Sequence, residues 1–575
     1  MVWKNANNQL CVTSMGVLGL QLATTLIAAS VLSKVISFFS FTRFLVVGLM
    51  RYAVPTDQQL LEACGNCKTR IKGKRKRNDS LSGVANGTNC HSDTFYFPRT
   101  TTIHLKHSHV SSSDIAILPL YSSHQWLVDF TVCAACVYLI NEVAYNCFIP
   151  WFESSDRNRT TLPGSMTIRN SPYLISLSVR INLSLVWIAL SLWFAIRTLI
   201  SLTALYFQSK NNTTTYDSRP LKCIANTTPT KTPSGECILI LAAGFFFFIA
   251  ATLFISLDGT LADFGLQAAY GNLTIGEFSS SSTPIISWGA FHFILAFVAC
   301  IIGSLFVYPG IKFGKIYINT VKQHPVSLVK RFILHLNFIC PIFPILLWLT
   351  PVTNHISHSL IMLTHNNSLA GKPFLIMIVN VISNLFMKHL DSIRLIVSLA
   401  VVLIRLSSVR WTLQAYLNSA QDKLDKFTHE AGQTSNKEVQ RLVASIFYCL
   451  NLVSLQYIAP CFCFLCLLCL YKNLSGLSWL PNYQHQYSDR FSVIPSSFEL
   501  RHNLTSLFSI DFINQTSWTA AFMEARYIFS QIVEDLSFRG ITIARGVFGF
   551  LVWWTLTSWQ LMSFLGLAYH RFTNE

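Results

Sequence analysis

Long apolar segments alternate with polar ones along most of the chain. Nine of them have about the 20 residues that a helix needs to cross the hydrocarbon core of a bilayer. These segments are 15–33, 126–148, 183–207, 238–257, 285–307, 332–350, 390–409, 435–471 and 546–569. The pattern therefore predicts an all-α polytopic membrane protein, a bundle of about nine transmembrane helices with kinked members.

Proline and capping signals mark expected ends and kinks within these spans. The prolines expected to end or bend a helix are Pro309 (followed by Gly310), Pro341, Pro344 and Pro460. Ser435 and Glu438 have the spacing of a capping box, which predicts that the long eighth span starts there.

Several weaker segments allow more than one interpretation. Segment 15–33 is short and rich in small residues, so a cleaved signal peptide is an alternative to a first span. Segment 38–50 is interrupted by Arg43 and is expected to be interfacial or re-entrant. Segment 373–386 is either a half-helix or an extension of the seventh span. Segment 413–427 is amphipathic.

The polar stretches between the spans define the domain organisation. The expected parts are a leader with the first span (1–50), a basic hydrophilic loop (51–123), a transmembrane core of spans two to eight (124–471), a large polar loop (472–545), and the last span with a short tail (546–575).

Lysine and arginine counts in the shorter loops set the expected orientation. Loops 308–331 and 410–441 carry five each and should be cytosolic, which places the N-terminus and loop 472–545 outside. The glycosylation sequons expected on the outside are Asn158, Asn272, Asn366, Asn473, Asn503 and Asn514.

Composition supports a membrane protein and excludes other classes. Only 12% of the 575 residues are charged and 51% are hydrophobic, whereas soluble chains are about 25% charged. The net charge of +17 would suggest nucleic acid in a soluble chain, but much of the lysine and arginine flanks apolar spans. We expect no nucleic-acid partner. The basic run at 68–77 predicts contact with anionic lipid headgroups.

The sequence contains little that would support catalysis or metal binding. It lacks the GxxxxGK[ST], HExxH and GxSxG motifs, so we expect no enzyme and no cofactor. The four cysteines of 461–469 have metal-like spacing but no neighbouring histidine or acid, and small apolar filler is the better interpretation. Cys64 with Cys67, and the histidines of 104–109, remain weak metal or redox candidates.

Six ionisable residues lie inside the predicted spans and form the candidate site. They are Asp129, Glu142, Arg197, Asp391, Arg394 and Arg405. On an ideal helix the last three fall within roughly 60° of one face, and such a stripe cannot comfortably face lipid.

Heights within the spans suggest specific pairs. Glu142 and Arg394 lie roughly 24 and 22 Å above the cytosolic end, Asp129 and Arg405 both roughly 5 Å, and Arg197 about 13 Å. We therefore predict that Glu142 pairs with Arg394 or Asp129 with Arg405, and that Arg197 faces the same interior. Both pairs could form together only if the second span were kinked or a third helix took part, because Asp129 and Glu142 point about 140° apart on an ideal helix. The alternative is that Asp129 and Arg405, and less readily Arg394, lie within about a turn of the membrane interface and extend their charged groups to it.

Motifs in nearly every span resemble one known family. They include MGVLGLQL from Met15, HQWLVDFTV from His124, HLNFICPIFPILLWLTPVT from His335, LQAYLNSAQ from Leu413, LQYIAP from Leu455, and FLGLAYH near the C-terminus. The chain resembles the transmembrane protein 161 family, departing from it in the leader before Met15 and in longer polar loops. The resemblance implies a multi-pass protein that reaches the plasma membrane through the secretory pathway and controls potassium and calcium currents. It implies no catalytic residues.

Two functions compete at this point. The first is non-enzymatic regulation of cation currents through ion-channel subunits, which the resemblance implies. The alternative is an ion or small-solute transporter or channel in which Glu142, Arg197 and Arg394 line a charged pathway; broken helices allow it, although no selectivity-filter loop is visible. A membrane enzyme acting on lipid would need a nucleophile or metal site that the sequence does not show.

Overall fold

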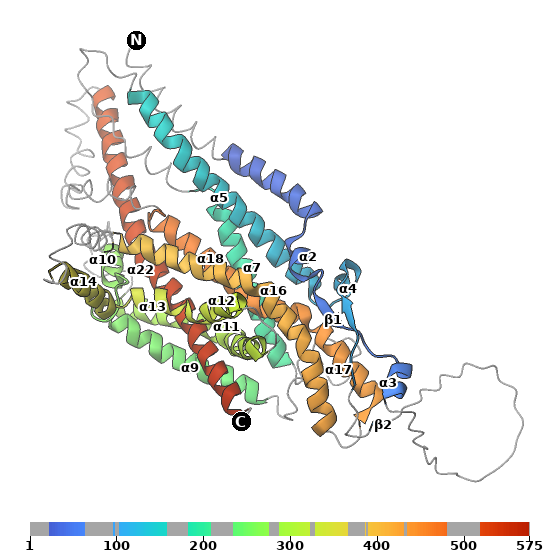
Figure 1. Cartoon of the computed structure of the whole chain (residues 1–575). Coiled ribbons are helices and arrows are strands. Elements are labelled where there is room, and N and C mark those ends of the chain that lie inside the picture. The colour runs from blue at the N-terminus through green and yellow to red at the C-terminus, as the bar shows by residue number, and fades with distance from the viewer. Residues whose placement is uncertain are drawn as a thin grey trace, which may run out of the picture.

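In the computed structural model all the long elements are α-helices, and the strands have only two or three residues (Figure 1). The structure describes residues 22–63, 96–97, 103–157, 182–208, 234–274, 287–322, 328–365, 386, 389–430, 434–479 and 518–573. Within these residues eight helices are long and apolar enough to cross a membrane, and a shorter apolar helix spans Leu22–Phe38. The predicted all-α polytopic fold is confirmed.

The bounds of the elements follow the apolar segments. The helices are α2 (Phe41–Val46), α3 (Asp57–Ala63), α4 (Ser112–Ala116), α5 (Tyr121–Arg157), α7 (Leu185–Gln208), α9 (Ser234–Ser256), α10 (Leu266–Thr274), α11 (Trp288–Lys322), α12 (Leu328–Ile339), α13 (Ile342–Leu347), α14 (Thr350–His365), α16 (Leu390–Glu430), α17 (Asn436–Tyr448), α18 (Leu450–Leu474) and α22 (Trp518–Thr573). The strands are β1 (Met50–Tyr52), β2 (Tyr96–Phe97), β3 (His107–His109) and β4 (Thr434–Ser435), with β1 antiparallel to β3 and β2 antiparallel to β4.

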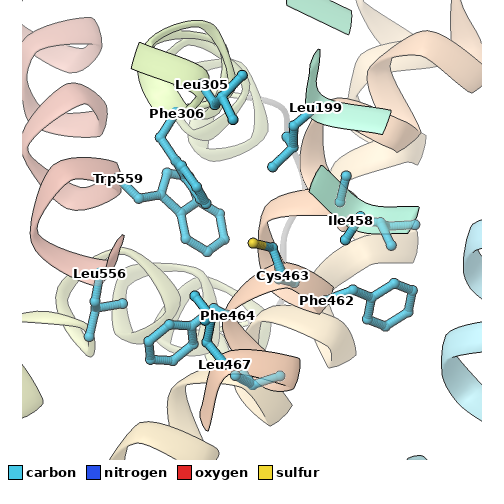
Figure 2. Close-up of a cluster of buried hydrophobic side chains, with 14 of the residues drawn as sticks. Leu199, Leu305, Phe306, Ile458, Phe462, Cys463, Phe464, Leu467, Leu556 and Trp559 are labelled. Carbon is cyan, nitrogen blue, oxygen red and sulfur yellow. The ribbon is translucent and has the colours of Figure 1, made fainter. Parts of the chain in front are cut away.

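Helix α18 lies at the centre of the bundle. In the most apolar part of its span 89% of the residues are buried, compared with 28% for α7 and for α9. Figure 2 shows Cys463 of α18 in the main core, with Trp559 of α22 and Phe306 of α11 on one side and Leu199 of α7 on the other.

Helices α11 and α22 pack with their backbones in close contact. A Cβ atom on Gly314 would lie 2.7 Å from the backbone nitrogen of Leu567, and one on Gly566 would lie 2.6 Å from the carbonyl oxygen of Ile311. Small residues allow this approach between membrane helices. Helix α11 continues through Pro309 to Lys322, so the prediction that the fifth span ends at Pro309–Gly310 is wrong.

Other predicted breaks need correction as well. Helix α18 runs through Pro460, and the interruption lies at Cys449, between α17 and α18. Helix α16 continues past Val409 to Glu430, so the amphipathic segment 413–427 is its second half. Helix α22 begins at Trp518, so the end of the predicted polar loop 472–545 is helical.

Two predicted local signals are confirmed. The sixth span is divided at Pro341, where α12 ends and α13 begins, although Pro344 lies inside α13. The capping box of α17 is present, with the Ser435 side chain accepting from the Glu438 amide and the Glu438 side chain accepting in return. Both signals depend on neighbouring residues alone, which makes them readable from sequence.

Parts of the predicted basic loop 51–123 form a small polar domain on α16 and α17. Leu60 of α3 and Leu105 pack with Leu424 and Val443 in a cluster separate from the main core. The second half of α16 is therefore amphipathic because it forms one wall of this domain. The basic run at 68–77 and nearly all of segment 373–386 lie outside the described residues.

The start of α4 is fixed by a second capping box. Ser111 caps the Asp114 amide, and Asp114 also forms a 3.0 Å ion pair with Arg51 of β1. Hydrogen bonds from Ser111, with a smaller contribution from the Arg51 charge, lower the pKa of Asp114. This contact ties α4 to the strand pair.

Candidate functional site

Arg394 is the centre of a four-charge group at the start of α16. Its Nη1 lies 3.0 Å from Asp391 Oδ1 and its Nη2 lies 3.2 Å from Asp263 Oδ2. Asp391 also forms an ion pair with Arg545 of α22. Two arginines and two aspartates give a group of zero net charge that joins α16, α22 and the segment after α9. We name these four residues the outer charge group.

The break between α13 and α14 supplies a further partner to Arg394. Its Nε donates to the carbonyl oxygen of Leu347 at 2.9 Å. Leu347 is the last residue of α13, where carbonyl groups lack an intrahelical partner. The guanidinium therefore also caps a broken membrane helix.

Glu142 forms an ion pair with Lys472 and not with Arg394. The two side chains are 13% and 8% exposed, and the pair joins α5 to α18. The predicted Glu142–Arg394 pair is therefore wrong. The ion pair holds the middle of α5 against the central helix α18.

Asp129 accepts hydrogen bonds at the N-terminus of helix α2 and does not pair with Arg405. One carboxylate oxygen accepts from Ser40 Oγ at 2.7 Å, and the other accepts from the backbone amide of Thr42 at 3.1 Å. These contacts lie at the N-terminus of α2, where unpaired amides attract negative charge. The predicted Asp129–Arg405 pair is wrong, and Asp129 is too buried to snorkel.

Arg405 is buried, with 1% of its surface exposed, and is held by aromatic rings. Its Cζ lies 3.6 Å from the Trp559 ring centroid and 4.8 Å from that of Phe313. Its Nη2 donates to Gln560 Oε1 at 3.1 Å. In the part of the chain that the structure describes, Arg405 forms no ion pair with a carboxylate, and its Nε and Nη1 lack a hydrogen-bond partner. Cation–π attraction takes the place of a counter-ion.

Arg197 differs from the other five residues because it lies on the outside of the bundle. It is exposed, on the face of α7 that also presents Leu190, Trp193 and Ile200. The prediction that it faces the interior is wrong. Helix α7 is apolar on nearly all sides, so its sequence pattern could not show which face packs inward.

The remaining candidates show no assembled chemical site among the described residues. No group of three potential metal ligands occurs there, and the cysteines of 461–469 are free and buried. Asn272 lies in α10, and Nδ2 of Asn473 is buried near the end of α18. The sequons that lie outside the described residues are Asn158, Asn366, Asn503 and Asn514.

The fold and these contacts define a multi-pass helical membrane protein in which interhelical contacts hold most of the membrane-embedded charges. The family described as predicted transmembrane protein 161AB matches residues 16–162 and 166–574. The chain therefore belongs to that family, and the resemblance seen in its motifs is confirmed. No solved structure matches the chain.

Proposed function

We propose that this protein acts without catalysis as a regulator of potassium and calcium currents in the plasma membrane, through direct contact with channel subunits. The chain belongs to the transmembrane protein 161 family, and the link to cation currents is what the resemblance to that family implies. The single observation that supports direct contact is the exposed Arg197 on an otherwise apolar face of α7.

The depth of Arg197 makes contact with lipid alone costly. Helix α7 has twelve residues before Arg197 and eleven after it, so its Cα lies about 17 Å from either end. A charge near the bilayer centre costs at least about 2.5 kcal/mol on insertion scales. A carboxylate on a neighbouring helix would offset this cost.

The partner is a different protein under this proposal. The acidic residues Asp129, Glu142 and Asp391 are buried in their own bundle, so a second copy cannot use them to neutralise Arg197. A channel subunit with a transmembrane aspartate or glutamate meets the requirement.

The contacts of the internal charges favour regulation over transport. A conduction pathway needs polar groups that can exchange protein partners for a solute. Glu142 is occupied by Lys472, and Arg394 by two aspartates and a carbonyl group. These groups act as links between helices under the proposal.

The proposal is tested by recording the current of a potassium or calcium channel in cells that express the channel with or without this protein. Arg197→Leu should abolish the change in current that the native chain causes, while Arg197→Lys should retain much of it. Ile200→Leu, on the same exposed face without a change of charge, is the matched control. An Arg197→Leu variant that still alters the current as the native chain does would overturn the contact.

Ion flux into liposomes containing only the purified protein separates the regulator from the transporter. We expect no flux from the native chain. Flux that both Glu142→Gln and Arg394→Gln alter would instead show that these residues line a pathway. Surface labelling and glycosidase treatment test the proposed plasma-membrane location and the glycosylation of the sequons.

A further inference from the structure

Five basic side chains converge at the end of the bundle that carries the C-terminus. They are Lys312 and Lys315 of α11, Lys423 and Lys426 of α16, and His570 of α22, and we name them the basic cluster. The charge of Lys426 acts on Lys315, and the charges of Lys312 and Lys315 act on both Lys423 and His570. All of these interactions are between groups of the same sign.

The packing of three helices brings the cluster together. The close contact of Gly314 with Leu567 places the lysines of α11 beside the last turns of α22. Helix α16 packs against α11, and Lys423 and Lys426 are three residues apart, so they share one of its faces. The convergence therefore comes from the fold and not from a run of basic residues.

Helix α16 directs its acidic residues elsewhere. Asp422 and Asp425 act electrostatically on Tyr52 of β1, so they face the small polar domain. Among the described residues, no carboxylate neutralises Lys315, Lys423 or Lys426 in an ion pair.

The basic cluster is more enclosed than ordinary surface lysines. Four of its side chains are half-buried, and only Lys426 is exposed. The Lys423 Nζ lies 5.1 Å from the ring centroid of Tyr416. Like charges in a partly desolvated site repel more strongly than in water, so the arrangement favours a bound anion.

Apolar side chains beside the cluster indicate the form of that anion. Phe564, Leu565, Tyr569 and Phe572 of α22 are 38–76% exposed. A ligand that combines a phosphate with acyl chains would contact both the lysines and these side chains. Basic pockets between transmembrane helices commonly bind lipid headgroups in this way.

We propose that the basic cluster binds the phosphorylated headgroup of an anionic lipid between α11, α16 and α22. The lysines neutralise the phosphate oxygens as point charges, and the acyl chains lie along the exposed face of α22. This site is separate from the basic run at 68–77 and does not depend on the proposed regulation of currents.

Native mass spectrometry of the purified full chain tests the site. The probes are phosphatidylinositol bisphosphate, phosphatidylcholine and soluble inositol trisphosphate. We expect the native chain to retain the first lipid, and the double variant Lys315→Gln with Lys423→Gln to bind it about 30-fold more weakly. Lys330→Gln with Lys437→Gln removes the same charge elsewhere and should bind as the native chain does.

Thermal unfolding without lipid separates lost binding from lost folding. The double variant should be at least as stable as the native chain, because it relieves repulsion. Equal retention of phosphatidylcholine, unchanged binding by the double variant, or binding of the soluble inositol phosphate alone would overturn the proposal.

Discussion

Arg394 and Arg405 occupy the same helix, eleven residues and about 16 Å apart, and both are buried. Arg394 lies between two carboxylates and a carbonyl group, whereas Arg405 lies between aromatic rings and forms one side-chain hydrogen bond. Two residues that look equivalent in sequence are thus stabilised in different ways. The comparison shows that a buried charge in a membrane span does not require a counter-ion.

The two sites should respond differently to the same substitution. At Arg394 a neutral side chain leaves two aspartates without their shared cation. At Arg405 it leaves only aromatic rings and a glutamine amide, which are neutral. Of the three predictions that follow, in order of decreasing effect, the first and the last test this difference, and the second tests the Glu142–Lys472 ion pair.

Arg394→Met should give the largest loss of stability. Removing one partner of a buried ion pair costs about 3–5 kcal/mol. Asp391 is 14% exposed and keeps its ion pair with Arg545, and Asp263 is 61% exposed, so the loss should lie at the lower end of that range. Unfolding in mixed detergent and SDS measures the change. Arg545→Met is the matched control, because Arg545 contacts the same aspartate from a side chain that is 50% exposed, and it should cost much less. Equal losses would show that Arg394 is not the centre of the outer charge group.

Charge reversal at Glu142 should have an intermediate effect that is specific to one partner. Glu142→Lys places two cations together at the contact between α5 and α18 and should cost about 2–4 kcal/mol. Adding Lys472→Glu should restore most of the stability, and adding Arg394→Glu should not. The same unfolding assay measures both double variants. Rescue by Arg394→Glu would support the pair predicted from sequence heights and contradict the structure.

The predicted height of an ionisable residue along its span indicated its level in the bundle, but it did not identify the residue with which it pairs. Glu142 and Arg394 do lie near the same end of the bundle, yet each binds a nearer group. Asp391 and Arg394 are three residues apart, so this pair could have been found from helical spacing alone. Asp263 and Arg545 come from distant segments of the sequence, and only the tertiary fold brings them close to the start of α16.

The fold class followed from apolar length, while helix ends depended on packing. Pro341 breaks a helix, but Pro309 and Pro460 lie inside continuous helices, at positions that are buried against neighbouring helices. In a membrane the lost hydrogen bond of a proline is tolerated when neighbouring helices pack around it. The outward direction of Arg197 also could not be predicted from the sequence, because the other residues of α7 are mostly apolar and do not indicate which face packs inward.

Arg405→Met should have the smallest effect of the three. Methionine is unbranched and flexible, although two heavy atoms shorter than arginine, and its thioether can still contact the Trp559 and Phe313 rings. The substitution removes a desolvated charge together with the attraction of that charge to the rings. The free energy gained by no longer burying a charge opposes the free energy lost with the cation–π attraction, so the expected change in stability is within about 1 kcal/mol. Arg405→Ala is the control, since it leaves a cavity and should cost about 2–4 kcal/mol. A loss for Arg405→Met as large as that for Arg394→Met would mean that the Arg405 charge itself is needed, and the aromatic site would then be no substitute for a counter-ion.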